Sequence, residues 1–123
     1  MDNKLSDLKK KLGGKWQTFE KLHKIIVSAN PDIGYRIFPI YAGYYLEDDN
    51  VAIVYFRGKF TSDTELNAGF NFKKEPKNSG FTSAAYMKYP RINYSIKLDT
   101  DKDIAKELMG AIKSLMRESI LKN

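Results

Sequence analysis

The sequence predicts an α+β fold, in which an antiparallel sheet of about five to six strands carries an N-terminal and a C-terminal helix on one face. Apolar residues recur at helical spacing near both ends of the 123-residue chain and alternate with polar residues in its middle. The segments between the expected strands are too short for crossover helices, which favours antiparallel pairing in a two-layer sandwich. The length predicts a single domain over residues 1–123, with its core within 16–118.

Two helices are expected before the sheet. Leucines at helical spacing predict a short leading helix over residues 3–12, which a pair of glycines interrupts. From Trp16 onward, apolar side chains fall on one helix face until Pro31 disfavours helical geometry in the residues before it. His23, the only histidine, lies on this apolar face, so we expect it to be a buried or half-buried structural residue.

The C-terminal helix has the clearest apolar stripe in the chain, running from Ile104 to Ile120. Thr100 and Asp103 are spaced as in a capping box, and Asp99 and Asp101 add negative charge that suits the positive end of a helix. We therefore expect Thr100 to cap the start of this helix.

Between the helices, apolar and polar residues alternate over 66–72 and 92–98, which predicts two strands with one dry and one wet face. Residues 51–56 are apolar on both faces, as in a central strand, and residues 44–46 should pair with them across the polar turn 47–50. The predicted wet face presents Asn67, Asn71 and Asn93, with Ser95 and Lys97 beside them.

This order of elements resembles the uncharacterised small domain family labelled "predicted transport protein". The resemblance runs from the helix ending at Asn30-Pro31-Asp32, through VAIVYF (51–56) and LNAGFNF (66–72), to RINYSIKL (91–98), and covers roughly residues 16–118. It implies the same arrangement of helices and sheet, no established activity, and attachment of some relatives to restriction or nuclease proteins. Members commonly carry a His in the strand before the last helix, where this chain has Asn93 or Tyr94. The resemblance supplies no catalytic residues.

The side-chain inventory argues against most catalytic and metal chemistry. The chain has no cysteine and a single histidine, which removes thiolate nucleophiles, disulfides and most metal sites. The acidic run 99–103 resembles the start of a calcium loop, but Ile104 and Gly110 stand where a glycine and a glutamate are required. Residues 13–15 lack the rest of a phosphate-binding loop. We expect no metal, no cofactor and no catalytic residue.

Residues 73–91 form a long segment with little periodicity, and such segments are often functional. Cations alternate there with aromatic rings, which is typical of surfaces that neutralise phosphates and stack bases. The chain's net charge of +6 permits attraction to polyanions and also suits solubility alone. The candidate binding residues are Lys73, Lys74, Lys77, Tyr86, Lys88, Tyr89 and Arg91. Alternatively, the segment is a solvated loop whose aromatic residues close the core.

The sequence therefore predicts a non-enzymatic binding or accessory domain that associates weakly with nucleic acid through this basic aromatic segment. Two alternatives stay open. The polar sheet face of Asn67, Asn71 and Asn93 could bind a small polar or anionic ligand, or the chain could be an enzyme of a type that its motifs do not reveal. A protein partner and self-association also stay open. No apolar run reaches the roughly 18 residues of a membrane span, and we expect a cytoplasmic protein without a membrane partner.

Overall fold

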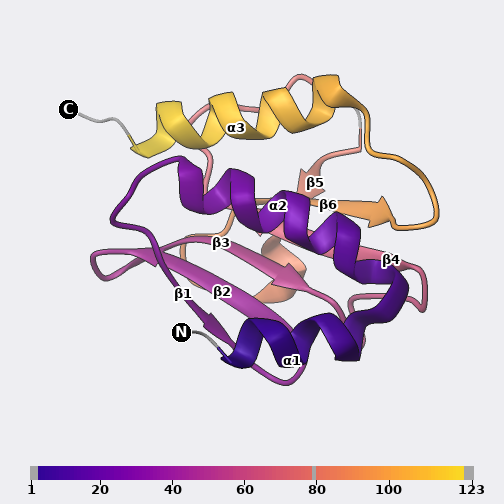
Figure 1. Ribbon diagram of the computed structural model, residues 1–123. Coiled ribbons are helices and arrows are strands. Elements are labelled where there is room, and N and C mark those ends of the chain that lie inside the picture. Colours follow the sequence, from indigo (N-terminus) through magenta and orange to yellow (C-terminus); the bar gives the residue numbers. More distant parts are fainter. Residues whose placement is uncertain (1–2, 79, 121–123) are drawn as a thin grey trace.

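The computed structural model describes residues 3–78 and 80–120. Within these residues the chain forms one six-stranded antiparallel sheet and three α-helices, which confirms the predicted α+β fold. Helices α1 (Asn3–Leu12) and α2 (Trp16–Ser28) precede the sheet, and α3 (Lys106–Ile120) follows it. The helices lie on the same face of the sheet, which we call the helix-bearing face (Figure 1). No helix in the described part of the chain is long and apolar enough to cross a bilayer.

The sheet is built mainly from short connections between neighbouring strands. Its strands are β1 (Gly34–Ile37), β2 (Tyr41–Leu46), β3 (Asp49–Tyr55), β4 (Glu65–Phe70), β5 (Thr82–Ser83) and β6 (Tyr94–Asp99). Their spatial order is β1-β2-β3-β4-β6-β5, so β6 lies between β4 and β5. The predicted hairpin is confirmed as β2 and β3, but its turn is shorter than the predicted 47–50, because Asp49 and Asn50 already belong to β3; Glu47 adopts a positive φ of 57° in this turn.

The main core lies between the sheet and the helices. Phe19, Leu22 and Ile26 of α2 are fully buried in it, together with Ile112 of α3. This confirms the apolar faces that the sequence predicts for the two helices. The predicted break between the first two helices is also confirmed, because a single 3-10 turn, η1 (Gly13–Lys15), separates α1 from α2 and Gly13 has a φ of 55°.

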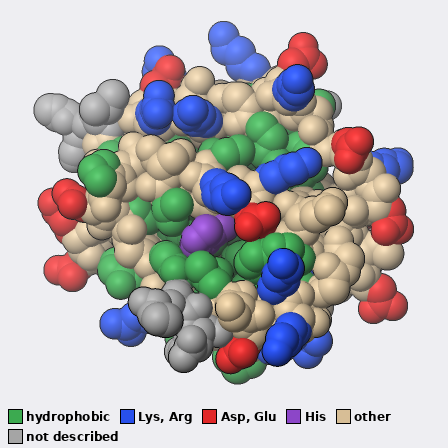
Figure 2. Space-filling model, in the orientation of Figure 1, with side chains coloured by type: hydrophobic (Ala, Val, Ile, Leu, Met, Phe, Trp, Pro, Cys, Tyr) green, Lys and Arg blue, Asp and Glu red, His purple; other side chains and the backbone are tan. Residues whose placement is uncertain are grey.

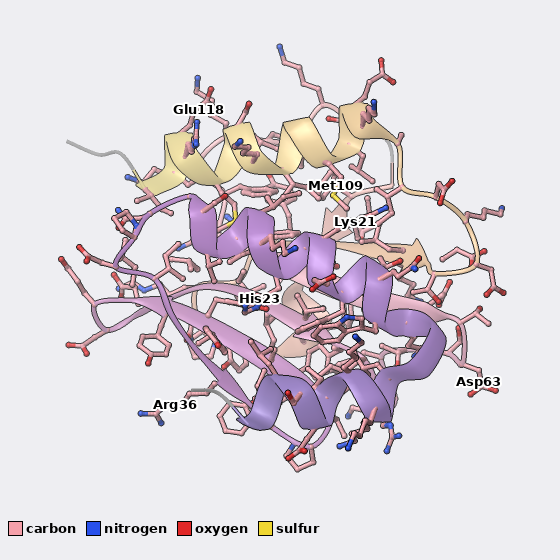
Figure 3. The ribbon with its side chains drawn as sticks, in the orientation of Figure 1. Lys21, His23, Arg36, Asp63, Met109 and Glu118 are labelled. Carbon is pink, nitrogen blue, oxygen red and sulfur yellow. The ribbon has the colours of Figure 1, made fainter. Side chains whose placement is uncertain are left out.

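His23 borders this core as a half-buried structural residue, as predicted. Its Nδ1 is 2.8 Å from the hydroxyl of Tyr44, and its ring stacks beside Phe19. Tyr44 is fully buried, and this burial raises the pKa of its hydroxyl above the usual range. Figure 2 shows the imidazole near the centre of the helix-bearing face, with hydrophobic side chains beside and below it and a basic and an acidic side chain next to it, and Figure 3 shows it between α2 and the sheet.

The opposite face of the sheet is covered as well, contrary to the predicted wet face. Along β3, alternate side chains point to opposite faces, and Ile53 and Tyr55 form a second apolar cluster away from the helices. Ala84, Met87 of the short 3-10 helix η2 (Ala85–Met87) and Ile92 complete this cluster. In Figure 1 this short helix lies behind the sheet, on the side away from α2.

This cover overturns two expectations about individual residues. Asn67 and Ser95, which alternation places on a wet face, are 0% and 1% exposed. Ile92, which alternation places on the dry face of a strand, precedes β6 and packs in the second cluster instead. The physical reason is the same in both cases, because the segment that leads to β6 folds back over the sheet and brings its own apolar side chains.

The expected cap of the last helix is also wrong. Helix α3 begins at Lys106, and Thr100 belongs to a turn that follows β6. The Thr100 hydroxyl donates a hydrogen bond to the carbonyl of Thr64 at 2.7 Å, and its backbone N–H donates to the same oxygen. Thr100 therefore closes the end of the β4–β6 pair rather than the start of α3.

Candidate functional site

The basic side chains of the segment 73–91 do not form one surface. At its start, Lys74 Nζ is 3.6 Å from the Glu118 carboxylate, and the Lys73 N–H donates to the Ser119 hydroxyl at 2.9 Å. Lys77 lines a shallow depression beside the same helix. Figure 3 places Glu118 on the outer side of α3, so these three lysines belong to the edge of the helix layer.

The end of the segment lies on the opposite face of the sheet. Tyr89 packs against the second apolar cluster, and burial raises the pKa of its hydroxyl to about 12. Lys88 ends η2 in a left-handed conformation, and Arg91 Nε is 3.5 Å from Asp49 Oδ1. On the helix-bearing face, Figure 2 shows Lys and Arg side chains spread among acidic ones rather than gathered into one basic patch.

The three asparagines of the predicted polar face also separate. Asn93 clamps the chain after β4, since its Nδ2 donates to the Phe72 carbonyl at 2.8 Å and its Oδ1 accepts the Phe72 N–H at 2.9 Å. Asn71 is half-buried, and its backbone N–H donates to the Val51 carbonyl. Neither residue lines the same hollow as Asn67.

Asn67 lies in a hollow of about 540 Å³ on the opposite face of the sheet, which we call the Asn67 hollow. The sheet register brings its parts together, because Asn67 of β4 pairs with Lys97 of β6, and Ser95 of β6 pairs with Thr82 of β5. Tyr86 of η2 forms another part of the lining. The volume is within the roughly 300–1,000 Å³ of small-molecule sites.

A chain of hydrogen bonds runs along the floor of the Asn67 hollow. Asn67 Nδ2 donates to the Phe60 carbonyl at 3.0 Å and to the Tyr86 hydroxyl at 2.8 Å. The Tyr86 hydroxyl is 2.9 Å from the Ser95 hydroxyl, which is 3.4 Å from that of Thr82. Because the Tyr86 oxygen accepts the amide proton, its own proton is free to be donated to Ser95.

The other atom of the Asn67 amide is unsatisfied. Asn67 is 0% exposed, and its Oδ1 has no hydrogen-bond partner in the part of the chain that the structure describes. The opposite orientation of the amide would bring Oδ1 against the Phe60 carbonyl oxygen, so the hydrogen bond to Phe60 fixes the orientation. A buried acceptor without a donor costs about 1–3 kcal/mol. A ligand that donates a hydrogen bond to this oxygen would remove that cost.

Two lysines give the Asn67 hollow its charge. Lys59 and Lys97 line it and are both exposed, and neither forms an ion pair with a described residue. Lys59 Nζ lies 5.3 Å from the centre of the Phe60 ring. The nearest acidic pair in the register, Glu65 with Asp99, does not line the hollow. The lining is therefore more apolar than polar, but it carries two cations that can attract an anion.

The wall that η2 provides depends on a close approach to the sheet at Gly69. A Cβ atom added to Gly69 would lie 2.7 Å from Ile92 Cγ2 and 3.0 Å from Met87 Sδ. Glycine is required at this position because a side chain would push η2 away from β4. A glycine inside a predicted strand is the one local signal in the sequence for this contact.

The sequence did not identify Lys59, Phe60 or Thr82 as site residues. Lys59 and Phe60 lie in an irregular loop after β3, and β5 is only two residues long, so neither stretch has a readable period. The hollow brings together Tyr86 from the basic aromatic set and Asn67, Ser95 and Lys97 from the predicted polar face. Among the described residues, no three acidic or histidine side chains are grouped so that they could hold a metal.

Comparison of the chain with family models, with curated proteins and with solved structures found no match. The resemblance to the family labelled "predicted transport protein" therefore stays a prediction. Function has to be argued from the geometry of the Asn67 hollow.

Proposed function

We propose that the protein is a binding module for a small anionic ligand that also carries a hydrogen-bond donor, and that the Asn67 hollow is its site. The observation that carries the proposal is the fully buried Asn67 amide: among the described residues, its Oδ1 has no donor and the two lysines of the hollow form no ion pair. A ligand that donates to this oxygen removes the cost of an unsatisfied buried acceptor. The oxygen is covered, so the flexible side chains around the hollow must shift to admit the donor.

Charge supports an anion as the second part of the ligand. Lys59 and Lys97 can each make a charge-assisted hydrogen bond to a carboxylate or phosphate oxygen. Both lysines are exposed, so their attraction is screened by salt and each contributes about 0.2–1 kcal/mol. The expected affinity is therefore modest and falls as ionic strength rises.

The geometry supports this function more directly than nucleic-acid association through the segment 73–91. A polyanion needs its phosphate contacts along one continuous track. Here Lys74 pairs with Glu118 beside α3, whereas Arg91 pairs with Asp49 at the start of β3. Of the residues predicted for nucleic-acid binding, Tyr86 is the one that lines the Asn67 hollow.

The test is a titration of the full chain with ribose 5-phosphate, which has a phosphate and hydroxyl donors, followed by amide chemical shifts in NMR spectra. We expect saturable shifts that are centred on Asn67 and Ser95 and that weaken at high salt. Replacing both Lys59 and Lys97 by alanine should weaken binding about 2- to 30-fold, as expected for two exposed charge contacts.

A matched control removes the same charge elsewhere. The double variant Lys73→Ala/Lys77→Ala takes two exposed lysines from the α3 side of the molecule and should leave the affinity unchanged. Shifts that map away from the Asn67 hollow, or equal losses in the two double variants, would overturn the proposal.

A further inference from the structure

We infer that the ligand class of the Asn67 hollow is a nucleoside monophosphate with an amino group on its base. This inference rests on the function proposed above and deepens it. It is drawn from one hollow whose lining combines Asn67, with its buried amide oxygen, two aromatic rings and two lysines that form no ion pair with a described residue. Each of these three features matches a different part of such a nucleotide.

The aromatic part of the lining belongs to a row of packed rings. The rings of Phe60 and Tyr86 meet edge to face, with centroids 5.2 Å apart and planes at 78°. On its other side Phe60 meets Tyr55 edge to face at 5.0 Å, and Tyr55 is packed against Tyr41 at 5.1 Å. A row of rings thus runs across the sheet and fixes Phe60 in place.

Tyr86 ends this row at the hollow and is 41% exposed, although its hydroxyl is tied into the hydrogen-bond chain on the floor. Its ring therefore has surface available for contact with a flat ligand. Bases are suited to such a surface because every base has a π face that stacks on an aromatic side chain. A simple carboxylate or phosphate would leave this surface unused.

The amide accounts for the amino group. Asparagine recognises adenine in nucleic acids by accepting from the exocyclic amine and donating to a ring nitrogen. Here Asn67 Nδ2 is already used by the Phe60 carbonyl and the Tyr86 hydroxyl, so only the accepting half of the amide is available. Asn67 Oδ1 is thus complementary to the exocyclic amine of a base.

The lysines account for the phosphate. Lys59 and Lys97 come from different elements and both are exposed, which suits a charged group that remains in contact with water while the base enters. A nucleoside without phosphate would leave both cations unused. Only a ligand with a base, an amine and a phosphate engages all three features of the hollow.

The experiment compares three ligands by calorimetry on the full chain: adenosine 5′-monophosphate, purine riboside 5′-monophosphate, which lacks the amino group, and ribose 5-phosphate, which lacks the base. We expect adenosine 5′-monophosphate to bind most tightly. Loss of the amino group should weaken binding about fivefold or more, because Oδ1 then stays unpaired. Loss of the whole base removes the amino group and the stacked ring together, so it should weaken binding by a further factor of about 5 to 150, the range for one stacked base.

Variants identify the site. Phe60→Leu removes a ring and should lower the preference for the nucleotide over ribose 5-phosphate. The double variant Lys59→Gln/Lys97→Gln should weaken the binding of adenosine 5′-monophosphate and of ribose 5-phosphate by the same factor. Both lysines are exposed, so this variant should keep the fold intact. Equal affinities for adenosine 5′-monophosphate and ribose 5-phosphate would overturn recognition of the base and leave the proposed anion site standing. Absence of binding by all three ligands would overturn both proposals.

Discussion

Replacement of Gly69 by alanine is the sharpest test of the second packed face, because it adds one methyl group where η2 touches the sheet. The added Cβ would lie 2.7 Å from Ile92 Cγ2 and 3.0 Å from Ile53 Cγ2 and Met87 Sδ. These distances are well below the roughly 3.5–4.0 Å at which carbon atoms attract each other, so at least one neighbour must move.

Two opposing terms set the magnitude. Alanine stiffens the unfolded chain and so stabilises a fold by about 0.4–1 kcal/mol where its conformation is allowed, and Gly69 has no positive φ that would forbid alanine. Overpacking a core costs about 1–3 kcal/mol. Packing wins, and we expect the Gly69→Ala variant to lose up to about 2.5 kcal/mol of unfolding free energy in urea denaturation.

Gly110→Ala is the matched control. Gly110 lies in the exposed part of α3 with no atom within 4 Å of an added Cβ, so alanine there should raise the unfolding free energy by up to about 1 kcal/mol. The two substitutions should therefore change stability in opposite directions. If Gly69→Ala were as stable as the parent or more so, η2 would not be packed against β4 and the wall of the Asn67 hollow would be lost with it.

Two further predictions concern single side chains. Lys15 Nζ donates to the Phe56 and Ser62 carbonyls, both at 2.8 Å, so Lys15→Met should lower the unfolding free energy by about 1–3 kcal/mol in the same denaturation assay. The variant should also weaken ribose 5-phosphate binding, because the loop between these carbonyls carries Lys59 and Phe60 of the hollow. Lys9→Met, at an exposed position of α1, should change neither quantity. Burial raises the pKa of Tyr89 to about 12, above the ordinary value of about 10. Between about pH 10 and pH 12 the tyrosine therefore ionises in the unfolded chain but not in the folded one, so the unfolding free energy should fall over this range. Tyr89→Phe should make the fall in melting temperature over this pH range smaller, and an unchanged profile would contradict the assigned burial.

The fold class and the helices could be predicted because their signals are local. The apolar stripe of α2 depends on residues three and four apart, and Pro31 limits its end whatever the rest of the chain does. The alternation over 66–72 likewise predicts strand β4. Each of these patterns is complete within one element.

The burial and the hydrogen-bond partners of the polar residues could not be predicted in the same way. Alternation treats Asn67 as solvated, since a polar residue opposite an apolar face is exposed in any one-sided sheet. What buries Asn67 is a segment nearly twenty residues further along, whose Tyr86 accepts its amide proton. The predicted cap at Thr100 is wrong for a similar reason, because the capping pattern is local, whereas the carbonyl that Thr100 binds belongs to the distant residue Thr64.

The composition of the segment 73–91 also does not indicate to which side of the sheet each of its side chains points. The basic aromatic segment contains the cations and rings of a nucleic-acid site, yet Lys74 is drawn to an acid on α3 and Arg91 to one on β3. A segment that crosses from one layer to the other must divide its side chains between them. The hollow instead combines Tyr86 from this segment with Lys59 from a loop that carried no signal.

The stability of the opposite face and the proposed binding site depend on the same segment. Met87 and Ile92 hold the segment on the sheet by apolar burial, and Tyr86 of the same segment is hydrogen-bonded to Asn67 and Ser95. Loosening the apolar contact must therefore weaken ligand binding, whereas removal of the exposed lysines at the hollow should weaken binding without lowering stability. Gly69→Ala and the double lysine variant separate these two effects: the first should change both melting temperature and affinity, and the second affinity only.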